Sequence, residues 1–384
     1  MRRCPAGVTV QGKAGPLPGR EEAVKNCDRR QWVGLCGALS AGLLLGTAPA
    51  RSLAQAAVPA PTPPPNPLRA PRLSSTRLVL AVEQRPALAY LPLTVAQRLG
   101  YFEAEGLDVE VRDLAEPGGA LKAVQSRAAH MVCGSFTQLL SASRVRAFLL
   151  QSRTPQIVLG VSRKALPQYR EVGDLAGRRI GVQAGHSTGR AVVRRVLEQG
   201  GLDLARVELV PQANPFAAVQ AFRNGAIDAI SFADPVITQL ELLGELRVVA
   251  DTRTLRGSTE VFGGPMPSVC LGAPIDFIAQ FPRLCQAVSD AMVHALKWLQ
   301  TAGVSDIIRA VPESHFQGDR ALYLAAFERM RESWTPDGLM PSEGPLIALR
   351  AMAMGDDAAL PEPQELQRSY TNDFARRSKA RFRA

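Results

Sequence analysis

Residues 185–189 read GHSTG and are the part of this 384-residue chain whose side chains are best suited to chemistry. They lie between a predicted strand and a predicted helix whose body begins near Arg190. A helix N-terminus offers unpaired backbone N–H groups and about half a positive charge, so it attracts anions. Ser187 and Thr188 would add hydroxyl donors, and His186 would add positive charge when protonated. The loop therefore indicates an anion-binding site, although Ser187 or Thr188 could also serve only to cap the helix.

The same five residues match the pattern G-x-S-x-G, which in α/β-hydrolases places a nucleophilic serine between a strand and a helix. In that alternative Ser187 attacks the substrate, and a later acid and base complete the triad. The candidates are Asp251 or Asp276 for the acid and His294 or His315 for the base. Three observations disfavour a hydrolase. His294 lies within a predicted amphipathic helix, no HGG oxyanion segment precedes the serine, and the strand pattern restarts instead of building one continuous sheet.

Polar residues and glycines also follow predicted strands in the first half of the chain. Ser135 and Phe136 come directly after a strand, where they would supply a hydrogen-bond donor and an apolar wall to a ligand. Gly118 and Gly119 open a helix, and the absence of side chains would let backbone approach a ligand closely or would simply make a flexible turn.

Three further positions are candidate ligand contacts with an equally simple structural explanation. Gln84 and Arg85 follow the first predicted strand. Arg85 could pair with an anion through two parallel hydrogen bonds, or it could be a solvated loop residue. Asp234 is expected to cap or position a helix on the hinge side, and contact with a ligand amine is the alternative.

The pattern of histidines and cysteines does not predict a metal or cofactor. His130, His186, His294 and His315 are scattered, and no H-E-x-x-H, C-x-x-C or Walker motif occurs. The predicted folded body contains three cysteines: Cys133, Cys270 and Cys285. An odd number favours buried free thiols, and one disulfide plus one thiol is the weaker alternative.

Apolar runs that alternate with amphipathic helices must position these residues. Runs near 78–82, 107–111, 130–133 and 157–161 predict four strands, and the pattern restarts at 180–182 with further strands near 207–210, 227–232 and 246–250. A return strand at 268–271 and a long helix from Pro282 follow. Two successive β-α-β-α runs predict two doubly wound α/β lobes. Ligands of such sheets bind outside the carboxyl ends of the strands, where the candidate residues lie.

These elements predict the boundaries of the parts of the chain. Lobe 1 would comprise residues 75–163 and 267–310, and lobe 2 residues 164–266. Residues 311–360 would form helices packed on lobe 1, and residues 361–384 a solvated, frayed basic tail.

The N-terminus has the pattern of an export signal. Arg29 and Arg30 precede an uncharged, leucine-containing stretch at 34–50 and an A-x-A cleavage pattern at 54–56. A charged region, a short apolar region and small residues at the cut define a secretory signal, and the paired arginines indicate the twin-arginine type. We therefore expect a signal peptide at 1–56 and, because seven prolines lie between residues 58 and 71, an extended linker at 57–74.

Charge and hydropathy exclude two broad classes. The net charge of +10 comes mostly from the two ends, because residues 57–360 carry 31 Lys and Arg against 29 Asp and Glu. A nucleic-acid binder would instead gather cations on a folded face, with aromatic residues between them. No apolar run reaches the roughly 18–20 residues of a membrane-spanning helix, which excludes a polytopic membrane protein.

Short motifs after the predicted strands make a family resemblance specific: GYF at 100–102, EGL at 105–107, CGSF at 133–136, DLAGRRIGV at 174–182, AIDA at 226–229, DP at 234–235, WTPDG at 334–338 and SEG at 342–344. Together they resemble the substrate-binding proteins of ABC importers in the nitrate/sulfonate/taurine, NMT1/THI5-like family, over about residues 76–350. Ala233 departs from the tryptophan of many sulfonate binders, which leaves the class of ligand open.

The resemblance implies a periplasmic-binding-protein-like fold and a non-enzymatic function. The expected protein is exported, periplasmic and monomeric, and it captures a small polar, anionic solute by closure of two lobes about a hinge. The solute would resemble a sulfonate, nitrate, taurine or a thiamine precursor, and the partners would be a separate ABC permease and ATPase. The pyrimidine-synthase branch of the same fold relies on a cysteine cluster that this chain lacks.

Overall fold

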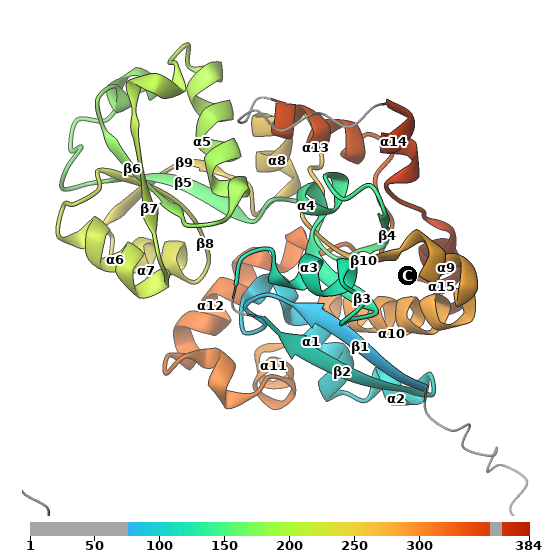
Figure 1. Cartoon of the computed structure of the whole chain (residues 1–384). Helices are drawn as coiled ribbons and strands as arrows, with labels where there is room; N and C mark the ends of the chain where they lie inside the picture. The colour runs from blue at the N-terminus through green and yellow to red at the C-terminus, as the bar shows by residue number, and fades with distance from the viewer. Residues whose placement is uncertain (1–75, 115, 354–362) are drawn as a thin grey trace, which may run out of the picture. The chain divides into compact units, whose positions relative to one another are not determined.

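Two five-stranded sheets, each covered by helices on both faces, form two lobes (Figure 1). The computed structural model describes residues 76–114, 116–353 and 363–384, with no side-chain description for 76 and 363–365. These residues belong to one compact unit. The predicted signal peptide and the proline-rich linker lie outside the described residues.

The sheet of the first lobe has the order β2-β1-β3-β10-β4. β1 runs parallel to β2 and β3, whereas β10 runs antiparallel to β3 and β4. The strands are β1 Thr76–Val82, β2 Leu107–Asp113, β3 Met131–Ser135, β4 Val145–Leu150 and β10 Val269–Pro274. The sequence analysis did not predict β4.

Alternate residues of β1 enter two different cores, as expected for a strand buried on both faces. Leu78, Leu80 and Val82 pack with the long helix α10, and Val79 and Ala81 pack on the opposite face with α3 and α4. The helices of this lobe before the C-terminal region are α1 Leu91–Arg98, α2 Tyr101–Ala104, α3 Gly119–Gln125, α4 Phe136–Leu140, α9 Ile275–Gln280 and α10 Pro282–Thr301. The predicted helix start at Pro282 is confirmed.

The sheet of the second lobe has the order β7-β6-β8-β5-β9. Its strands are β5 Ile157–Ser162, β6 Arg179–Gln183, β7 Glu208–Gln212, β8 Ala229–Ala233 and β9 Leu246–Asp251, and its helices are α5 Ser187–Gln199, α6 Pro215–Arg223, α7 Val236–Leu242 and α8 Leu255–Phe262. The assignment of residues 157–161 to lobe 1 was wrong. β5 lies between β8 and β9 and pairs antiparallel with both, so the first lobe ends before Ile157.

The chain passes between the lobes at residues 151–156 and again at 263–268, between the ends of the two sheets. Side-chain hydrogen bonds fix the first crossing. The amide nitrogen of Gln156 donates to the hydroxyls of Ser152 and Ser333, at 2.9 and 2.8 Å, and all three residues are buried. Ser152 also forms an isolated antiparallel bridge with Trp334. The predicted hinge is therefore braced by the segment that follows helix α12, Arg320–Met330.

The C-terminal region consists of α11 Val304–Ala310, α12 Arg320–Met330, α13 Gly344–Ala353, α14 Pro363–Arg368 and α15 Asp373–Phe382. Five short 3-10 helices complete the described elements: Leu88–Tyr90, Val172–Leu175, Leu204–Arg206, Glu313–Phe316 and Arg331–Ser333. Phe316, Tyr323 and Phe327 pack in the same core as α10, so the helices around α12 pack on the first lobe.

The prediction of a frayed basic tail at 361–384 was wrong for its last part. α15 packs against α10, and Phe374 and Ala375 are buried. Arg381 pairs with Asp290 at 2.5 Å, and Lys379 pairs with Asp337 at 2.8 Å. These partners lie far away in the sequence, so local charge alone made the segment look solvated.

The three cysteines of the described residues are free and buried, which confirms the expectation of buried thiols. Burial raises the pKa of Cys133 to about 12, although the amide of Gln151 donates to its sulfur at 2.8 Å. Such a thiol stays protonated near neutral pH and is a poor nucleophile.

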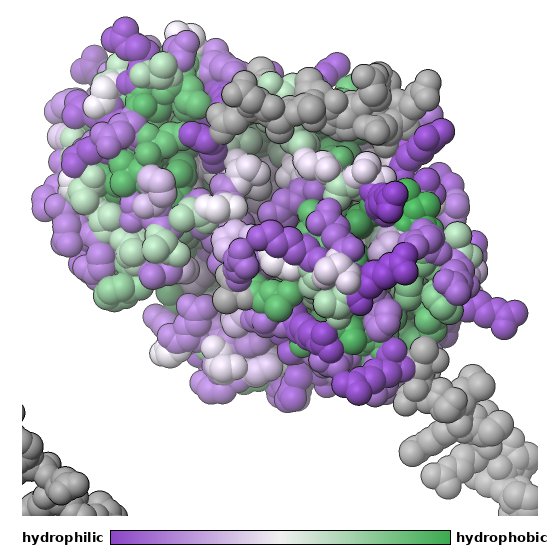
Figure 2. All heavy atoms as spheres, viewed as in Figure 1, coloured by the Kyte–Doolittle hydropathy of each residue, from purple (hydrophilic) through white to green (hydrophobic). Residues whose placement is uncertain are grey.

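The surface carries polar and charged residues over both lobes, with apolar residues between them (Figure 2). The most exposed large apolar side chain is that of Phe216, at the start of α6. None of the helices in the described ranges has the length and apolar character that a membrane crossing requires.

Candidate functional site

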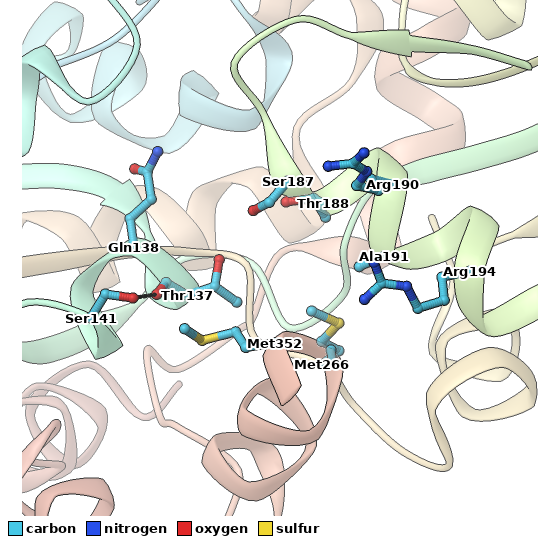
Figure 3. Close-up of a pocket in the computed structure, with 11 residues that line it drawn as sticks. Thr137, Gln138, Ser141, Ser187, Thr188, Arg190, Ala191, Arg194, Met266 and Met352 are labelled. Carbon is cyan, nitrogen blue, oxygen red and sulfur yellow. Dashed lines mark hydrogen bonds between the residues drawn. The ribbon is translucent and has the colours of Figure 1, made fainter. Parts of the chain in front are cut away.

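A cavity of about 230 Å³ lies between the N-terminal half of α5 and the short helix α4 of the other lobe (Figure 3). α4 contributes Thr137, Gln138 and Ser141, and α5 contributes Ser187, Thr188, Arg190, Ala191 and Arg194. Met266 from the second crossing and Ala351 and Met352 from α13 complete the lining. Both lobes therefore contribute hydroxyl groups to one cavity.

The start of α5 is held in place by its contact with β8. The hydroxyl of Ser231 donates to the carbonyl oxygen of Gly189 at 2.9 Å. A Cβ atom at Gly189 would lie 3.1 Å from the carbonyl oxygen of Ser231, so a larger residue would press the helix away from the strand. This contact fixes the first turn of α5, which carries Ser187 and Thr188.

Ser187 and Thr188 are the predicted site residues that line the cavity. They occupy the first two positions of α5, and His186 is the N-cap residue without a side-chain capping bond. Within the described residues no hydrogen bond engages either hydroxyl, so the simple capping role is not observed. His186 lies next to the cavity, where its Nδ1 is 3.1 Å from the carbonyl oxygen of Ala184. It lines a neighbouring cavity of about 390 Å³ within the second lobe.

The first lobe also contributes polar side chains to the cavity. The sequence analysis named Ser135, two positions before the first residue that lines it. Ser135 does not line the cavity, but its hydroxyl is hydrogen-bonded to that of Thr137 at 2.8 Å. Thr137 and Gln138 follow it on α4 and face α5 (Figure 3). The available signal was the hydroxyl of Thr137 in the first turn after the strand.

Phe136 was wrongly predicted to form an apolar wall for a ligand. Its side chain is fully buried and belongs to the core that packs under α3 and α4. Since successive residues at a helix start point in different directions, Phe136 enters the core while Thr137 faces the cavity.

The loops after β1 and β6 bring the lobes into contact beside the cavity. The amide of Gln183 donates to the side-chain oxygen of Gln84 at 3.3 Å. A Cβ atom at Gly185 would lie 2.7 Å from Cγ of Pro117, so the loop after β6 packs tightly on the loop before α3. Gln84 is therefore at the lobe contact, although it does not line the cavity.

Gly118 and Gly119 serve the start of α3. Gly118 is its N-cap residue with a φ of +77°, a left-handed conformation that favours glycine. The buried carboxylate of Glu83 accepts a hydrogen bond from the backbone nitrogen of Ala120 at 3.3 Å. The glycine pair thus forms a turn at the lobe contact, outside the cavity.

Arg85 and Asp234 have partners within the protein instead of facing the cavity. The guanidinium of Arg85 donates to the side chain of Gln97 on α1, and burial lowers its pKa. The carboxylate of Asp234 accepts a hydrogen bond from the backbone nitrogen of Thr238 in the first turn of α7 at 2.9 Å, and the N-cap residue of that helix is Pro235. It also pairs with Arg253 at 3.2 Å, which leaves no support for contact with a ligand amine.

The sequence analysis did not identify Arg194, the most deeply buried cation of the cavity wall. Only 8% of this residue is exposed, and its Nη1 atom is buried without a hydrogen-bond partner. Arg194 stands between Val192, Val193 and the pair at 196–197, all of which pack inward. An arginine inside an apolar helical stripe was the available signal.

Comparison with known proteins identifies the family of this chain. A family model described as NMT1/THI5 like matches residues 88–300, which is more than half of the chain. A solved structure of a protein from Bordetella bronchiseptica RB50 is 40% identical, with a TM-score of 0.69, and the match covers 82% of this chain and 99% of that chain. The chain belongs to the NMT1/THI5-like family. A comparison with curated proteins found no match.

Two more distant structures show how widely the fold of this NMT1/THI5-like protein is used. The alkanesulfonate-binding protein SsuA from Xanthomonas axonopodis pv. citri, bound to MOPS, is 19% identical with a TM-score of 0.59, and the match covers 78% of this chain and 99% of that chain. The desulfurization enzyme DSZB is also 19% identical, with a TM-score of 0.57, and the match covers 80% and 99%. At such identities the likeness shows the periplasmic-binding-protein fold alone, and the function must be argued from the site.

The NMT1/THI5-like chain does not assemble the triad that the alternative hydrolase hypothesis requires. Ser187 lies in the first turn of a regular helix, whereas a nucleophile elbow is a strained turn. Asp251 pairs with Arg253 at 2.5 Å, and Asp276 is exposed. None of the four triad candidates named from the sequence lines the cavity that Ser187 lines.

Both candidate bases are engaged elsewhere in this NMT1/THI5-like protein. The ring of His294 is stacked on Tyr101, with the ring centres 3.9 Å apart, and burial lowers its pKa. His315 is buried in the 3-10 helix before α12. The described residues also contain no group of three His, Cys, Asp or Glu side chains arranged as metal ligands.

Proposed function

We propose that this protein is an exported solute-binding protein of an ABC importer and that it captures a small anionic solute by closure of its two lobes. The observation that carries the proposal is the cavity of about 230 Å³ lined by hydroxyls from both lobes, Thr137 from one and Ser187 and Thr188 from the other. A solute that contacts both walls stabilises the closed arrangement, because its binding energy is gained only when the walls approach.

The first turn of α5 accounts for the preference for an anion. α5 has 13 residues, and its first turn presents backbone N–H groups together with the unengaged hydroxyls of Ser187 and Thr188. These groups donate hydrogen bonds, and the helix dipole adds positive potential at the same point. The Xanthomonas neighbour is named as an alkanesulfonate-binding protein, which makes sulfonates the first ligands to test.

Binding is tested by thermal shift followed by calorimetric titration. The screen contains alkanesulfonates, taurine, nitrate, bicarbonate, aromatic carboxylic acids and thiamine precursors. A solute present at a hundredfold excess over its Kd stabilises the folded protein by about 2.7 kcal/mol, which gives a clear melting shift. If none of these solutes shifts the melting temperature, the proposed function is contradicted.

The contribution of α5 is tested with Ser187→Ala. A hydrogen bond to a charged group contributes about 1.5–3 kcal/mol, so the variant should weaken binding about tenfold or more. The matched control is Ser126→Ala, because the hydroxyl of Ser126 is bonded to the carbonyl oxygen of Ala123 and does not line the cavity. Equal affinities of the two variants would remove Ser187 from the site.

Closure is tested at the contact between the loops. Gly185→Ala places a Cβ atom 2.7 Å from Pro117 and should hold the lobes apart, which lowers affinity and increases the radius of gyration of the protein with solute. Gly201→Ala is the matched control, because Gly201 has a similar φ of +70° but nothing within 4 Å of the added atom. If both variants bind equally well, closure at this contact is not needed for binding.

Export to the periplasm and delivery to a permease and ATPase complete the proposal. The support is the signal-like sequence around Arg29, Arg30 and residues 54–56, together with membership of the family. Replacing both arginines by lysine should leave the precursor in the cytoplasm, as measured by cell fractionation. Normal export of the double variant would indicate a general secretory signal instead of a twin-arginine signal.

A further inference from the structure

Arg194 lies in the wall of the cavity, and one nitrogen of its guanidinium is buried without a partner among the described residues. The residue is 8% exposed, its Nη1 is buried without a hydrogen bond, and no ion pair to it occurs within the described ranges. A buried charge without a partner is unfavourable, because the group has lost water and gained nothing in exchange. Such a group is suited to a partner that arrives from outside.

The guanidinium of Arg194 and the first turn of α5 can act on the same group of a ligand. Arg194 follows Ser187 by seven residues, which is about 10 Å along the helix axis, but helical side chains lean toward the N-terminus. In Figure 3 the guanidinium of Arg194 points into the cavity, on the wall that also carries Ser187 and Thr188. Two separate features, an unpartnered cation and a helix N-terminus, therefore converge on one cavity.

Part of the cavity lining is apolar, beside the polar residues that α4 contributes opposite α5. Met266, Met352, Ala191 and Ala351 all line the cavity, and Figure 3 shows Met266 beside the guanidinium of Arg194 and Met352 nearer to Thr137. Thioether side chains are flexible and apolar, so they adapt to the shape of an alkyl or aryl group. No Asp or Glu among the described residues lines this cavity, so its described lining has no counter-charge for an ammonium group.

The volume also favours a ligand larger than an inorganic oxyanion. About 230 Å³ corresponds to roughly eight water molecules at 30 Å³ each. Nitrate and sulfate have only four and five heavy atoms and would leave the methionine side unfilled. A chain or ring of several carbon atoms would fill it.

We propose that Arg194 holds the charged group of an organic anion whose uncharged, apolar body lies against Met266 and Met352. This inference rests on the proposed solute-binding function and narrows it to monoanions such as alkyl or aryl sulfonates and carboxylates. Zwitterions are disfavoured, because the described lining of the cavity contains no carboxylate for an ammonium. Inorganic oxyanions are disfavoured, because they would leave the side chains of Met266 and Met352 uncovered.

The test compares matched ligands by calorimetric titration with the wild-type protein. Propanesulfonate and taurine have similar size and differ by a methyl group against an ammonium, so propanesulfonate should bind at least tenfold more tightly. Affinity should rise about fourfold per added methylene from ethanesulfonate toward hexanesulfonate until the cavity is full. A parallel series of carboxylates shows which of the two anionic groups the site prefers.

The role of Arg194 is tested with Arg194→Met, Arg194→Lys and Met352→Glu. Arg194→Met should weaken propanesulfonate binding about tenfold or more, and Arg194→Lys less, because lysine keeps the charge but not the two parallel donors. Met352→Glu places a negative charge in the cavity wall. The variant should bind alkanesulfonates more weakly, and the affinity for taurine should rise relative to theirs. Arg223→Met is the control, because Arg223 pairs with Glu245 on the surface of the second lobe and should leave affinity unchanged.

The outcomes separate the inference from the proposed function. If taurine or nitrate binds more tightly than propanesulfonate, or if Arg194→Met binds as well as Arg223→Met, the inference is overturned while a solute-binding function stands. If Arg194→Met does not fold, the ligand series and Met352→Glu still decide it. If no ligand binds the folded wild-type protein, the inference and the proposed function both fail.

Discussion

Two buried arginines of the second lobe, Arg253 and Arg194, differ only slightly in exposure but strongly in their partners. Arg253 is 4% exposed and Arg194 is 8% exposed. Arg253 pairs with Asp234 and Glu241, each at 3.2 Å, and with Asp251 at 2.5 Å. Arg194 has no such partner among the described residues and faces a cavity instead.

The partners of Arg253 make it part of the structure that holds the lobes. Burial alone would lower its pKa, but hydrogen bonds with Asp251 and the charges of Asp234 and Asp251 outweigh burial and raise it. Glu241 also pairs with Arg329 on α12, which packs on the first lobe. The network therefore ties α7 of the second lobe to a helix of the first.

The two arginines show that the role of a buried cation depends on its partners. A charge whose partners belong to the chain stabilises the folded state, and its removal leaves carboxylates without compensation. A charge without internal partners costs stability in the absence of ligand, so its presence is explained by something that it binds. The two sites make opposite predictions for the same substitution.

The largest effect is expected for Arg253→Met. The side chain of Asp234 is fully buried, so losing its partner should lower the free energy of unfolding by about 3–5 kcal/mol. Urea denaturation followed by circular dichroism measures this change. Adding Asp234→Asn should restore part of the loss, because the double variant no longer buries an unpaired carboxylate. A loss below about 1 kcal/mol for Arg253→Met would contradict a structural role for the network.

An intermediate effect is expected for Asp228→Asn at the pair between Asp228 and Arg179. Nη2 of Arg179 lies 3.0 Å from Oδ1 of Asp228. Because 41% of the Arg179 side chain is exposed, solvent screens the pair. We expect a loss of about 1 kcal/mol at neutral pH. Asp276→Asn is the control, because its pair with Arg127 is exposed on both sides and should contribute nothing measurable.

The effect of Asp228→Asn should depend on pH in a defined direction. Burial would raise the pKa of Asp228, but its hydrogen bonds with Arg179 outweigh burial and lower the pKa below 3.8. A lowered folded-state pKa contributes stability above the unfolded-state pKa, and this stability is lost as the pH falls through the folded-state pKa. The difference in unfolding free energy between wild type and variant should therefore be constant from pH 7 to about 5 and shrink below about pH 4. A difference that grows in acid would refute the assignment.

The local parts of the fold could be predicted from the sequence, whereas the non-local parts could not. Apolar runs such as 78–82 and the stripe of α5 encode strands and helices through their own periodicity. β4 and the position of β5 depend on which strands lie side by side. The pairing of β5 with β8 and β9 is set by residues some 70 to 90 positions later in the chain, so sequence order placed it in the wrong lobe.

The C-terminal helix α15 illustrates the same limit for charge. Its arginines and lysine look like a solvated run, but Arg381 reaches Asp290, and Phe374 enters the core beside Phe148. Compensation across about 90 residues has no local signature. A phenylalanine four residues before a small, buried Ser378 was the only hint of a packed face.

The residues of the site also fall into a group that the local sequence predicts and a group that it does not. Ser187 and Thr188 could be predicted, because a strand, a glycine turn and a hydroxyl at a helix start are neighbours in the sequence. Thr137 and Met352 reach the cavity only through the fold, in which α13 packs against both α4 and α5. Arg194 was hidden because a residue in an apolar stripe looks buried, and its lack of a partner is visible only in three dimensions.

The smallest effect, close to zero, is expected for the stability of Arg194→Met without solute. Methionine keeps most of the aliphatic length of arginine and removes a charge that is buried without compensation. Replacing a buried charge by an apolar side chain of similar volume is often neutral or stabilising, so the free energy of unfolding should stay within about 0.5 kcal/mol of wild type or rise by about 1 kcal/mol. Urea denaturation in solute-free buffer measures it, beside Arg253→Met under the same conditions. A loss of 3 kcal/mol or more would mean that Arg194 has a structural partner like that of Arg253, and the distinction between the two arginines would disappear.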